Sequence, residues 1–166
     1  RRAYDFVIVD TFPLFDRFII AILDLCDLTY IVLDNTVPTV LSIASLTQLL
    51  TGLDYSDEKQ RVIVNRFSRK ASCPSVEEVA NRIDRSVDHV LPFNKRVIAA
   101  ANTGDPFSLH PRFFSALDRG LRGIVDEIES IAREQVSDAS PEASLIYPTP
   151  EPQEINQQTV TSEPSW

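Results

Sequence analysis

The chain has 166 residues, of which 43% are hydrophobic and 24% are charged, and its net charge is −8. This composition is ordinary for a globular protein and excludes a chain that is too polar to form a core. No apolar run reaches the roughly 18–20 residues of a membrane helix, so we expect neither a membrane span nor a secretory signal peptide.

The first half of the chain predicts two buried strands, each followed by a helix. The apolar run Phe6–Val9 predicts a strand that is buried on both faces, and apolar spacing predicts a helix over 14–25. A second buried strand is predicted over 28–33. The next helix is expected over 38–50, with Pro in its first turn and Gly52 at its end.

The second half predicts two further strands separated by helices. Residues 61–64 predict a third buried strand, and Ser-Val-Glu-Glu at 75–78 is a capping box that starts a short helix. A fourth, shorter strand is predicted over 87–91. A short helix is expected over 97–101, and apolar residues at helical spacing predict a final helix over 111–134.

Strands that alternate with helices predict an α/β fold, with a mostly parallel, twisted sheet and flanking helices. The predicted strands are followed by Asp10, Asp34, Asn65 and Pro92. In such sheets ligands bind at the carboxyl ends of the strands. The sequence therefore predicts a binding site at this edge of the sheet.

The last 30 residues differ in composition from the rest. Residues 137–166 contain five acidic residues, five of the eleven prolines and no Lys or Arg. Such a segment cannot bury enough apolar area to offset its ordering entropy, so we expect a disordered, acidic, Pro-rich tail. Residues 1–136 then carry 19 acidic and 16 basic residues. A domain so close to neutral has no basic stripe for nucleic acid.

The cysteines and the start of the chain carry less information. Cys26 and Cys73 fit no metal or disulfide spacing, so we expect reduced thiols. The chain contains no methionine and reaches a predicted buried strand within a few residues of Arg1. The simplest interpretation is that an N-terminal part is missing, and a processed or trimmed chain is the alternative.

Five stretches of the sequence resemble the MinD/ParA group of P-loop ATPases, in that group's order and spacing. They are YDFVIVDTFP, DLCDLTYIVLDNTVPTVLSI, RVIVNRF, VLPFNKRVIAAANTGDPF and SALDRGLRGIVDEI. Within the group, VIVNRF and LPFNKRVIAAANTGDPF are most similar to the CpaE/TadZ-like pilus-assembly proteins. The resemblance implies that residues 1–136 form the C-terminal portion of a P-loop ATPase domain, with ATP and Mg²⁺ as its cofactors.

The resemblance implies roles at the phosphate end of a nucleotide site. Asp10 matches the Walker B aspartate, which lies near Mg²⁺ and its waters, and it is the implied catalytic and metal-binding residue. Thr11 to Pro13 match the switch II segment, which responds to the γ-phosphate. From the residues alone, Asp10 could equally be a turn residue at a strand end.

The resemblance also implies roles at the base end. Asn65 matches the residue whose side-chain amide recognises adenine, a task that suits a group offering a donor and an acceptor together. Arg66 could stack on the base or border it. The alternative for Asn65 is again a turn residue. Other residues that match the border of the base pocket are Pro92, Phe93, Asn102, Gly104 and Pro106. The stretch 102–104 is also typical of a helix C-cap, which does not exclude the pocket role.

Two departures from the family's pattern stand out. None of the four glycines lies in a strand, Gly-rich loop and helix context, so the phosphate-binding loop is absent from this sequence. In the family that loop lies N-terminal to the Walker B strand, which agrees with a missing N-terminal part. The switch segment has Phe12 where the group often has Pro, which bears on hydrolysis more than on binding. His89 and His110 match nothing functional.

The function implied is that of an ATP-binding, weakly hydrolysing cytoplasmic protein that forms a nucleotide-dependent homodimer. It would position pilus or secretion assembly proteins, and it would reach the inner membrane through partners, because the acidic tail lacks a basic amphipathic helix. A non-enzymatic pseudo-ATPase scaffold is one alternative. A DNA-partitioning ParA-type ATPase is the other, and the near-neutral domain argues against it.

Overall fold

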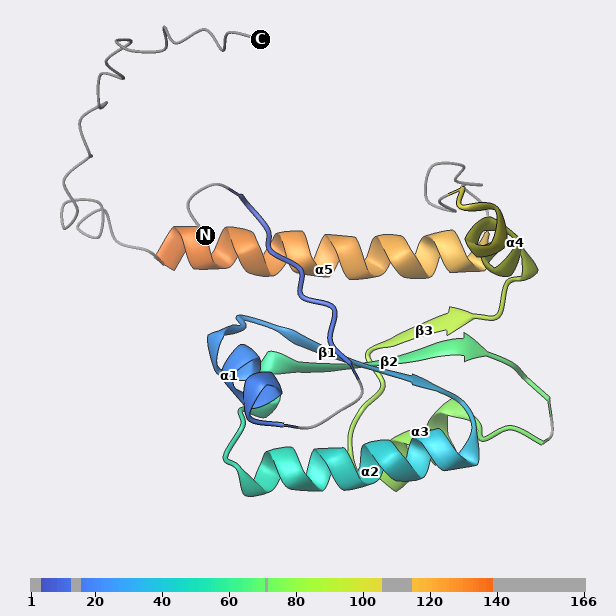
Figure 1. Cartoon of the computed structure of the whole chain (residues 1–166), viewed down its shortest axis with the longest axis horizontal. Helices are drawn as coiled ribbons and strands as arrows, with labels where there is room; N and C mark the ends of the chain where they lie inside the picture. Colours follow the sequence, from blue (N-terminus) through green and yellow to red (C-terminus); the bar gives the residue numbers. More distant parts are fainter. Residues whose placement is uncertain (1–3, 13–15, 71, 106–114, 139–166) are drawn as a thin grey trace, which may run out of the picture. The chain divides into compact units, whose positions relative to one another are not determined.

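The computed structural model describes residues 4–12, 16–70, 72–105 and 115–138, with side chains as far as Glu134 (Figure 1). The chain divides into two units, Arg1–Glu127 and Ile128–Trp166. All of the strands lie in the first unit. In the part of the chain that is described, no helix has the length and apolar character needed to cross a membrane. The tail was predicted over 137–166, but residues 137 and 138 are helical, so its predicted start is wrong by two residues. Residues 139–166, together with Pro13, Pro106 and His110, lie outside the described residues.

Three parallel strands form one sheet in the order β1-β2-β3 (Figure 1). These strands are β1 (Thr29–Asp34), β2 (Gln60–Phe67) and β3 (His89–Pro92). Because β1 and β2 pair in register from Thr29 opposite Gln60 to Asp34 opposite Asn65, their carboxyl ends meet at the same edge. The three strands predicted from 28–33, 61–64 and 87–91 are confirmed, and β2 continues past its predicted end to Phe67.

The helices lie where the sequence patterns predict them, with shifted ends. Ser75 and Glu78 form the predicted capping box at the start of α3. The predicted stop at Gly52 is displaced by one residue, because Gly52 is still helical and Leu53 is the C-cap. The helices are α1 (Arg17–Leu25), α2 (Val37–Gly52), the 3₁₀ helix η1 (Asp57–Lys59), α3 (Val76–Ile83), α4 (Lys95–Thr103) and α5 (Ala116–Asp138).

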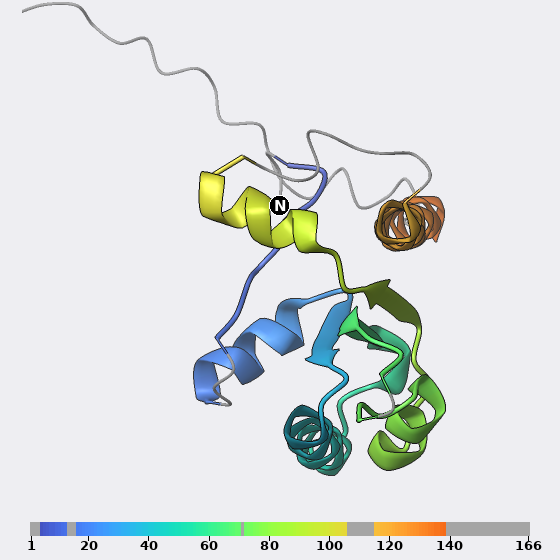
Figure 2. The same ribbon diagram turned by 90° about the vertical axis from the view of Figure 1, so that its right-hand side faces the viewer.

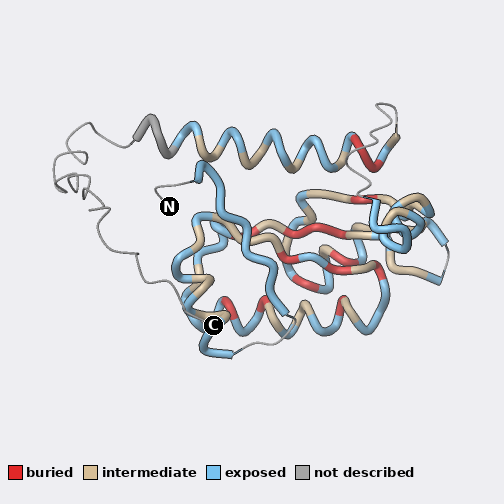
Figure 3. The backbone as a smooth tube through the Cα atoms, turned by 45° about the horizontal axis from the view of Figure 1, so that its top comes forward, coloured by how far each residue is buried: buried red, intermediate tan, exposed pale blue. Residues whose placement is uncertain are grey.

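The core lies on both faces of the sheet, since alternate residues of β2 point to opposite sides. Val62 and Val64 face α2 and α3, which cover one face (Figures 1 and 2). Ile63 points to the other face, where it packs against Leu117 in the first turn of α5 and Leu91. Figure 3 shows that many of the buried residues lie in these strands, with others in single turns of the helices.

A glycine allows α5 to approach β3 closely. A Cβ atom built on Gly120 would lie 2.7 Å from Cδ2 of Leu91 and 3.4 Å from the carbonyl oxygen of Val90. At Gly123, one turn further along, the nearest such atom is Nδ1 of His89 at 4.0 Å. A side chain at position 120 would therefore force the Leu91 side chain to move, whereas position 123 has room for a methyl group.

The predicted buried strand at Phe6–Val9 is wrong. Residues 4–12 form no strand, and Ile8 is 88% exposed. A run that is apolar on both faces becomes a buried strand only when hydrogen-bonding neighbours and covering helices surround it. Among the described residues, β1 pairs with β2 alone, and nothing pairs with 6–9.

Candidate functional site

Four of the predicted site residues lie together at the carboxyl ends of β2 and β3. They are Asn65, Arg66, Pro92 and Phe93. Asn65 is opposite Asp34, the last residue of β1. Phe67 pairs with Pro92, and the backbone N–H of Phe93 donates to the Phe67 carbonyl at 3.0 Å. We call this group the carboxyl-edge site, which consists of Asp34, Asn35, Asn65, Arg66, Phe67, Pro92 and Phe93.

The backbone of this site contains a bulge at Arg66. The pairing of β2 with β3 shifts between Val64 and Phe67, and Arg66 adopts a φ of 51°, in the left-handed region. That conformation costs a residue other than glycine about 1–2 kcal/mol. Bulges re-aim side chains next to binding sites. The Oδ1 atom of Asn65 accepts from the Arg66 N–H at 2.9 Å, which holds the amide in place.

The Arg66 guanidinium is held loosely. Its Nη1 atom lies 3.5 Å from Oδ2 of Asp34, with the two side chains 58% and 35% exposed. An ion pair this exposed contributes about 0–1 kcal/mol. The pair therefore holds the guanidinium only weakly near the end of β1. The sequence analysis did not predict this ion pair.

Asn35 is a member of the site that the sequence analysis missed. It is buried, and its Nδ2 atom donates to the carbonyls of Ser68 at 2.9 Å and Pro74 at 3.2 Å. These bonds tie the loop after β2 to the end of β1. The available signal was an Asp-Asn pair directly after a predicted strand, because Asn side chains readily bond to nearby backbone.

Asp10 and Thr11 lie elsewhere. They line a separate hollow of about 240 Å³ with Phe12 and residues of α1. Asp16 also borders it, but Asp16 caps α1 by accepting from two backbone N–H groups. Among the described residues, no hydrogen bond or ion pair joins Asp10 or Thr11 to the carboxyl-edge site. The structure thus brings Asn65, Arg66, Pro92 and Phe93 together, and within the described part of the chain it joins neither Asp10 nor Thr11 to them.

The helix after β3 borders the carboxyl-edge site. Asn94 follows Phe93 and caps α4 by accepting from the Arg96 N–H at 3.0 Å. At the other end of α4, Gly104 has a φ of 68° and forms the left-handed C-cap, which confirms the C-cap interpretation of 102–104. Asn102 is exposed in the last turn.

A polar network joins α5 to all three strands on the face opposite α2. Glu127 accepts from the Tyr30 hydroxyl at 2.8 Å and from Nε of Arg61 at 2.7 Å, and lies 2.7 Å from Nε2 of His89. Burial raises the pKa of Glu127, but the hydrogen bonds from His89, Arg61 and Tyr30 outweigh it and hold the pKa below its ordinary value. Burial, followed by the bond to Glu127, raises the pKa of Tyr30. The network has a structural role: its hydrogen bonds connect α5 to the sheet, and His89 contributes one of them.

The donor set of the carboxyl edge suits a purine base. The Nδ2 group of Asn65 has no partner among the described residues, and the Asn65 oxygen retains a second lone pair, so the amide can both donate and accept. At the phosphate end, Asp10 could be one Mg²⁺ ligand, but the described residues contain neither a Gly-rich loop nor a group of three metal-binding side chains. The residues present fit the base end of ATP and do not form a cradle for its phosphates.

The chain is similar in sequence to a septum site-determining protein. It is 26% identical over 129 residues to MinD of Thermotoga maritima, a match that covers 72% of this chain and 48% of that protein. The chain therefore spans about half the length of this curated relative. No protein-family model matches it.

The chain is also similar to solved structures. A ParA family ATPase from Chlorobium tepidum matches with a TM-score of 0.54 and 16% identity, over 63% of this chain and 43% of that one. The MinC:MinD cell division complex of Aquifex aeolicus gives a TM-score of 0.49 and 21% identity, over 69% of this chain and 45% of that one. The narrower similarity to CpaE/TadZ-like proteins stays a prediction. The sequence match to MinD and the fold shared with a ParA ATPase support homology between this chain and the MinD/ParA-type P-loop ATPases.

Proposed function

We propose that this chain is the C-terminal portion of a MinD/ParA-like ATP-binding domain and that its carboxyl-edge site receives the adenine base. The observation that carries the proposal is the bulge at Arg66, which gathers Asn65, Arg66 and Phe93 at the ends of adjacent strands. The resemblance of the sequence to the MinD/ParA group of P-loop ATPases supports the choice of nucleotide.

The chemistry of the site supports an adenine ligand. An asparagine amide can bond to adenine as donor and acceptor at once, as it does when it reads the N6/N7 edge. Phe93 is 47% exposed, and the Arg66 side chain is 58% exposed, so both offer flat groups for stacking. Pro92 then borders the base through its backbone.

Two features of the sheet support the proposal that the domain is partial. Among the described residues β1 has one neighbouring strand, and the four consecutive apolar side chains of residues 6–9 are all exposed. In the proposed intact domain, further strands cover this edge and supply the phosphate loop. Asp10 then holds Mg²⁺ through its carboxylate or its waters, and Thr11 and Pro13 face the γ-phosphate. Hydrolysis there depends on positioning and charge stabilisation.

The cellular role is the finer part of the proposal. The intact protein forms a nucleotide-dependent homodimer in the cytoplasm and positions pilus or secretion assembly proteins, at the inner membrane through those partners. The resemblance of RVIVNRF and VLPFNKRVIAAANTGDPF to CpaE/TadZ-like proteins supports it.

Nuclear magnetic resonance of the ¹⁵N-labelled chain tests the base site. We expect adenosine and Mg²⁺–ATP to shift the amides of Asn65, Arg66 and Phe93 with similar, weak affinity, because the phosphates find no loop. Asn65→Ala should remove these shifts, whereas Asn81→Ala, an exposed position on α3, should leave them unchanged. Micromolar ATP affinity, or shifts that avoid the carboxyl edge, would contradict the proposal.

The coding region upstream of Arg1 separates the enzyme from its main alternative. A strand followed by a Gly-rich loop with lysines supports an ATPase. A loop without glycine or lysine supports a pseudo-ATPase scaffold with the same fold. Salt-dependent DNA binding by the whole protein would instead support a partitioning ATPase.

A further inference from the structure

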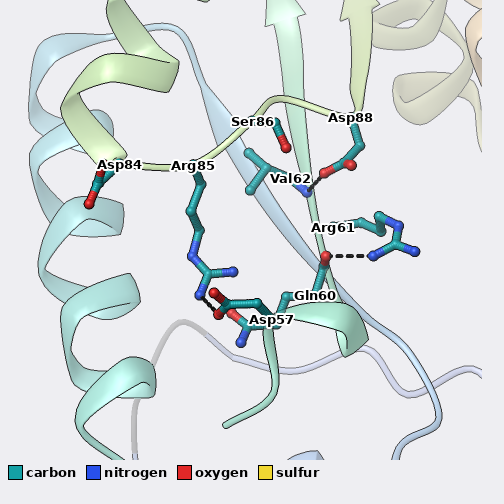
Figure 4. A pocket seen from close by; sticks show the side chains of 8 residues that line it. All are labelled: Asp57, Gln60, Arg61, Val62, Asp84, Arg85, Ser86 and Asp88. Carbon is teal, nitrogen blue, oxygen red and sulfur yellow. Dashed lines mark hydrogen bonds and ion pairs between the residues drawn. The ribbon is translucent and has the colours of Figure 1, made fainter. Parts of the chain in front are cut away.

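A second pocket lies at the amino-terminal edge of the sheet, opposite the carboxyl-edge site. It has a volume of about 270 Å³. Figure 4 shows side chains around it from two segments, η1 with the start of β2, and the turn between α3 and β3. We call it the amino-end pocket and define it by Asp57, Gln60, Val62, Arg85, Ser86 and Asp88.

Gln60 carries a buried acceptor without a partner in this pocket. The residue is 4% exposed, and its Nε2 group donates to the carbonyls of Tyr55 and Ser56, both at 3.1 Å. Its Oε1 atom is buried and has no hydrogen-bond partner among the described residues. Figure 4 shows the side chain pointing toward Asp57 and Arg85 at the pocket's lower end. A buried acceptor without a hydrogen bond lowers the stability of the folded state, so a ligand that donates to this oxygen would be stabilised there.

The arginines around the pocket already have anionic partners. Arg85 forms an ion pair with Asp57. Arg61, which also lines the pocket, bonds to Glu127 at 2.7 Å and donates to the carbonyls of Glu58 and Gln60. The positive charges are therefore used within the protein, and the pocket is poorly suited to an anion.

The remaining polar groups are acceptors on two sides. Asp88 accepts from the Val62 N–H at 2.7 Å with one oxygen, which leaves the other for a ligand. Figure 4 shows the Ser86 hydroxyl and the Asp88 carboxylate on the side opposite Gln60. A ligand that donates hydrogen bonds and carries positive charge matches the free acceptors of Gln60 and Asp88, and the Ser86 hydroxyl can accept a further bond.

We infer that the amino-end pocket binds the guanidinium group of a small molecule or of an arginine side chain. A guanidinium is planar and offers five N–H donors, and it carries the positive charge that matches a pocket whose unused acceptors include Gln60 Oε1 and the second carboxylate oxygen of Asp88. A metal ion suits the pocket less well, because the described residues contain no group of three His, Cys, Asp or Glu side chains arranged for one. The inference is independent of the nucleotide site.

A titration of the ¹⁵N-labelled full chain with agmatine tests the inference. We expect saturable shifts of the Gln60 side-chain amide and of the backbone amides of Val62, Ser86 and Asp88. Tetramethylammonium, which has charge but no N–H donor, should cause none of them. The capped peptide acetyl-Gly-Arg-Gly-amide shows whether the same pocket also accepts arginine in a protein chain. Equal shifts with tetramethylammonium, or shifts that do not saturate with agmatine, would overturn the inference.

Two variants make the test specific. Asp88→Asn keeps an oxygen for the Val62 N–H and removes the charge, so agmatine affinity should fall about tenfold, as expected for a lost charge-assisted bond. Ser86→Ala should weaken binding by a smaller factor without disturbing the fold. Asp24→Asn removes the same charge from an exposed position on α1 and is the matched control. Equal affinity in Asp88→Asn and Asp24→Asn would overturn the inference.

Discussion

Replacing Glu127 with Gln tests how the last helix is held to the sheet. The carboxylate contacts Tyr30, Arg61 and His89 at 2.7–2.8 Å. In the variant, the carbonyl oxygen of Gln can accept a hydrogen bond from Arg61. Its NH₂ group can donate to Tyr30 and His89, because a hydroxyl and a neutral imidazole can also accept. The main loss is one charge-assisted bond, about 1.5–3 kcal/mol. We expect the free energy of unfolding, from urea titration followed by circular dichroism, to fall by this amount at pH 7.

The pH dependence of the Glu127→Gln effect provides the sharper test. The pKa of Glu127 is lower in the folded state than its ordinary value of 4.5, so its contribution is present above that pH and is lost as the pH falls through the folded pKa. The gap between the two proteins should therefore close in acid. Glu129→Gln, which breaks only an exposed pair with Arg133, is the control and should cost about 0.3–0.5 kcal/mol. A Glu127 variant no worse than this control at pH 7, or a gap that persists at low pH, would refute the reasoning.

Three further predictions follow from the packing. Gly120→Val should destabilise the chain by about 1–3 kcal/mol, because a Cβ there meets a β3 side chain at 2.7 Å, whereas Gly123→Ala should stabilise it by about 0.5–1 kcal/mol through helix propensity. Thermal unfolding of both variants measures the contrast, and equal effects would contradict the close approach. Asn35→Ala should cost about 1–3 kcal/mol in urea unfolding, because it removes the two hydrogen bonds that the buried Asn35 amide donates to partly buried loop carbonyls; a cost below 0.5 kcal/mol, on the order of a surface change, would count against it. In hydrogen exchange, the amides of 6–9 should exchange nearly unprotected, while those of Val62–Val64 exchange only on global unfolding.

Much of the fold could be predicted because its signals are local. The Ser75 capping box and the apolar runs at 28–33 and 61–64 depend on residues close in sequence, and each gave the right element. The run at 6–9 has an equally strong apolar signal but forms no strand, since a strand also requires a neighbour to pair with. Sequence periodicity reports the side chains of a strand and says nothing about the availability of that neighbour.

The site was predictable in part for the same reason. The strand ends placed Asn65 and Pro92 at one edge, and the register of β1 with β2 brought Asp34 beside them. The bulge at Arg66 was not foreseen, because it arises from the shift in pairing between β2 and β3. The role of Asn35 depends on loop carbonyls 33 and 39 positions away, which local patterns cannot indicate.

The identity of residue 66 bears on the proposal that this edge binds adenine. Its φ of 51° suits glycine, so an arginine there costs about 1–2 kcal/mol. The exposed pair with Asp34 returns about 0–1 kcal/mol and does not offset that cost. An arginine at a strained position, whose side chain has only this exposed ion pair, is consistent with the proposed use in binding. Arg66→Gly should therefore change the free energy of unfolding by no more than about 1 kcal/mol while weakening adenosine binding. If Arg66→Gly instead unfolds the chain and spares adenosine binding, the arginine serves the fold and this argument fails.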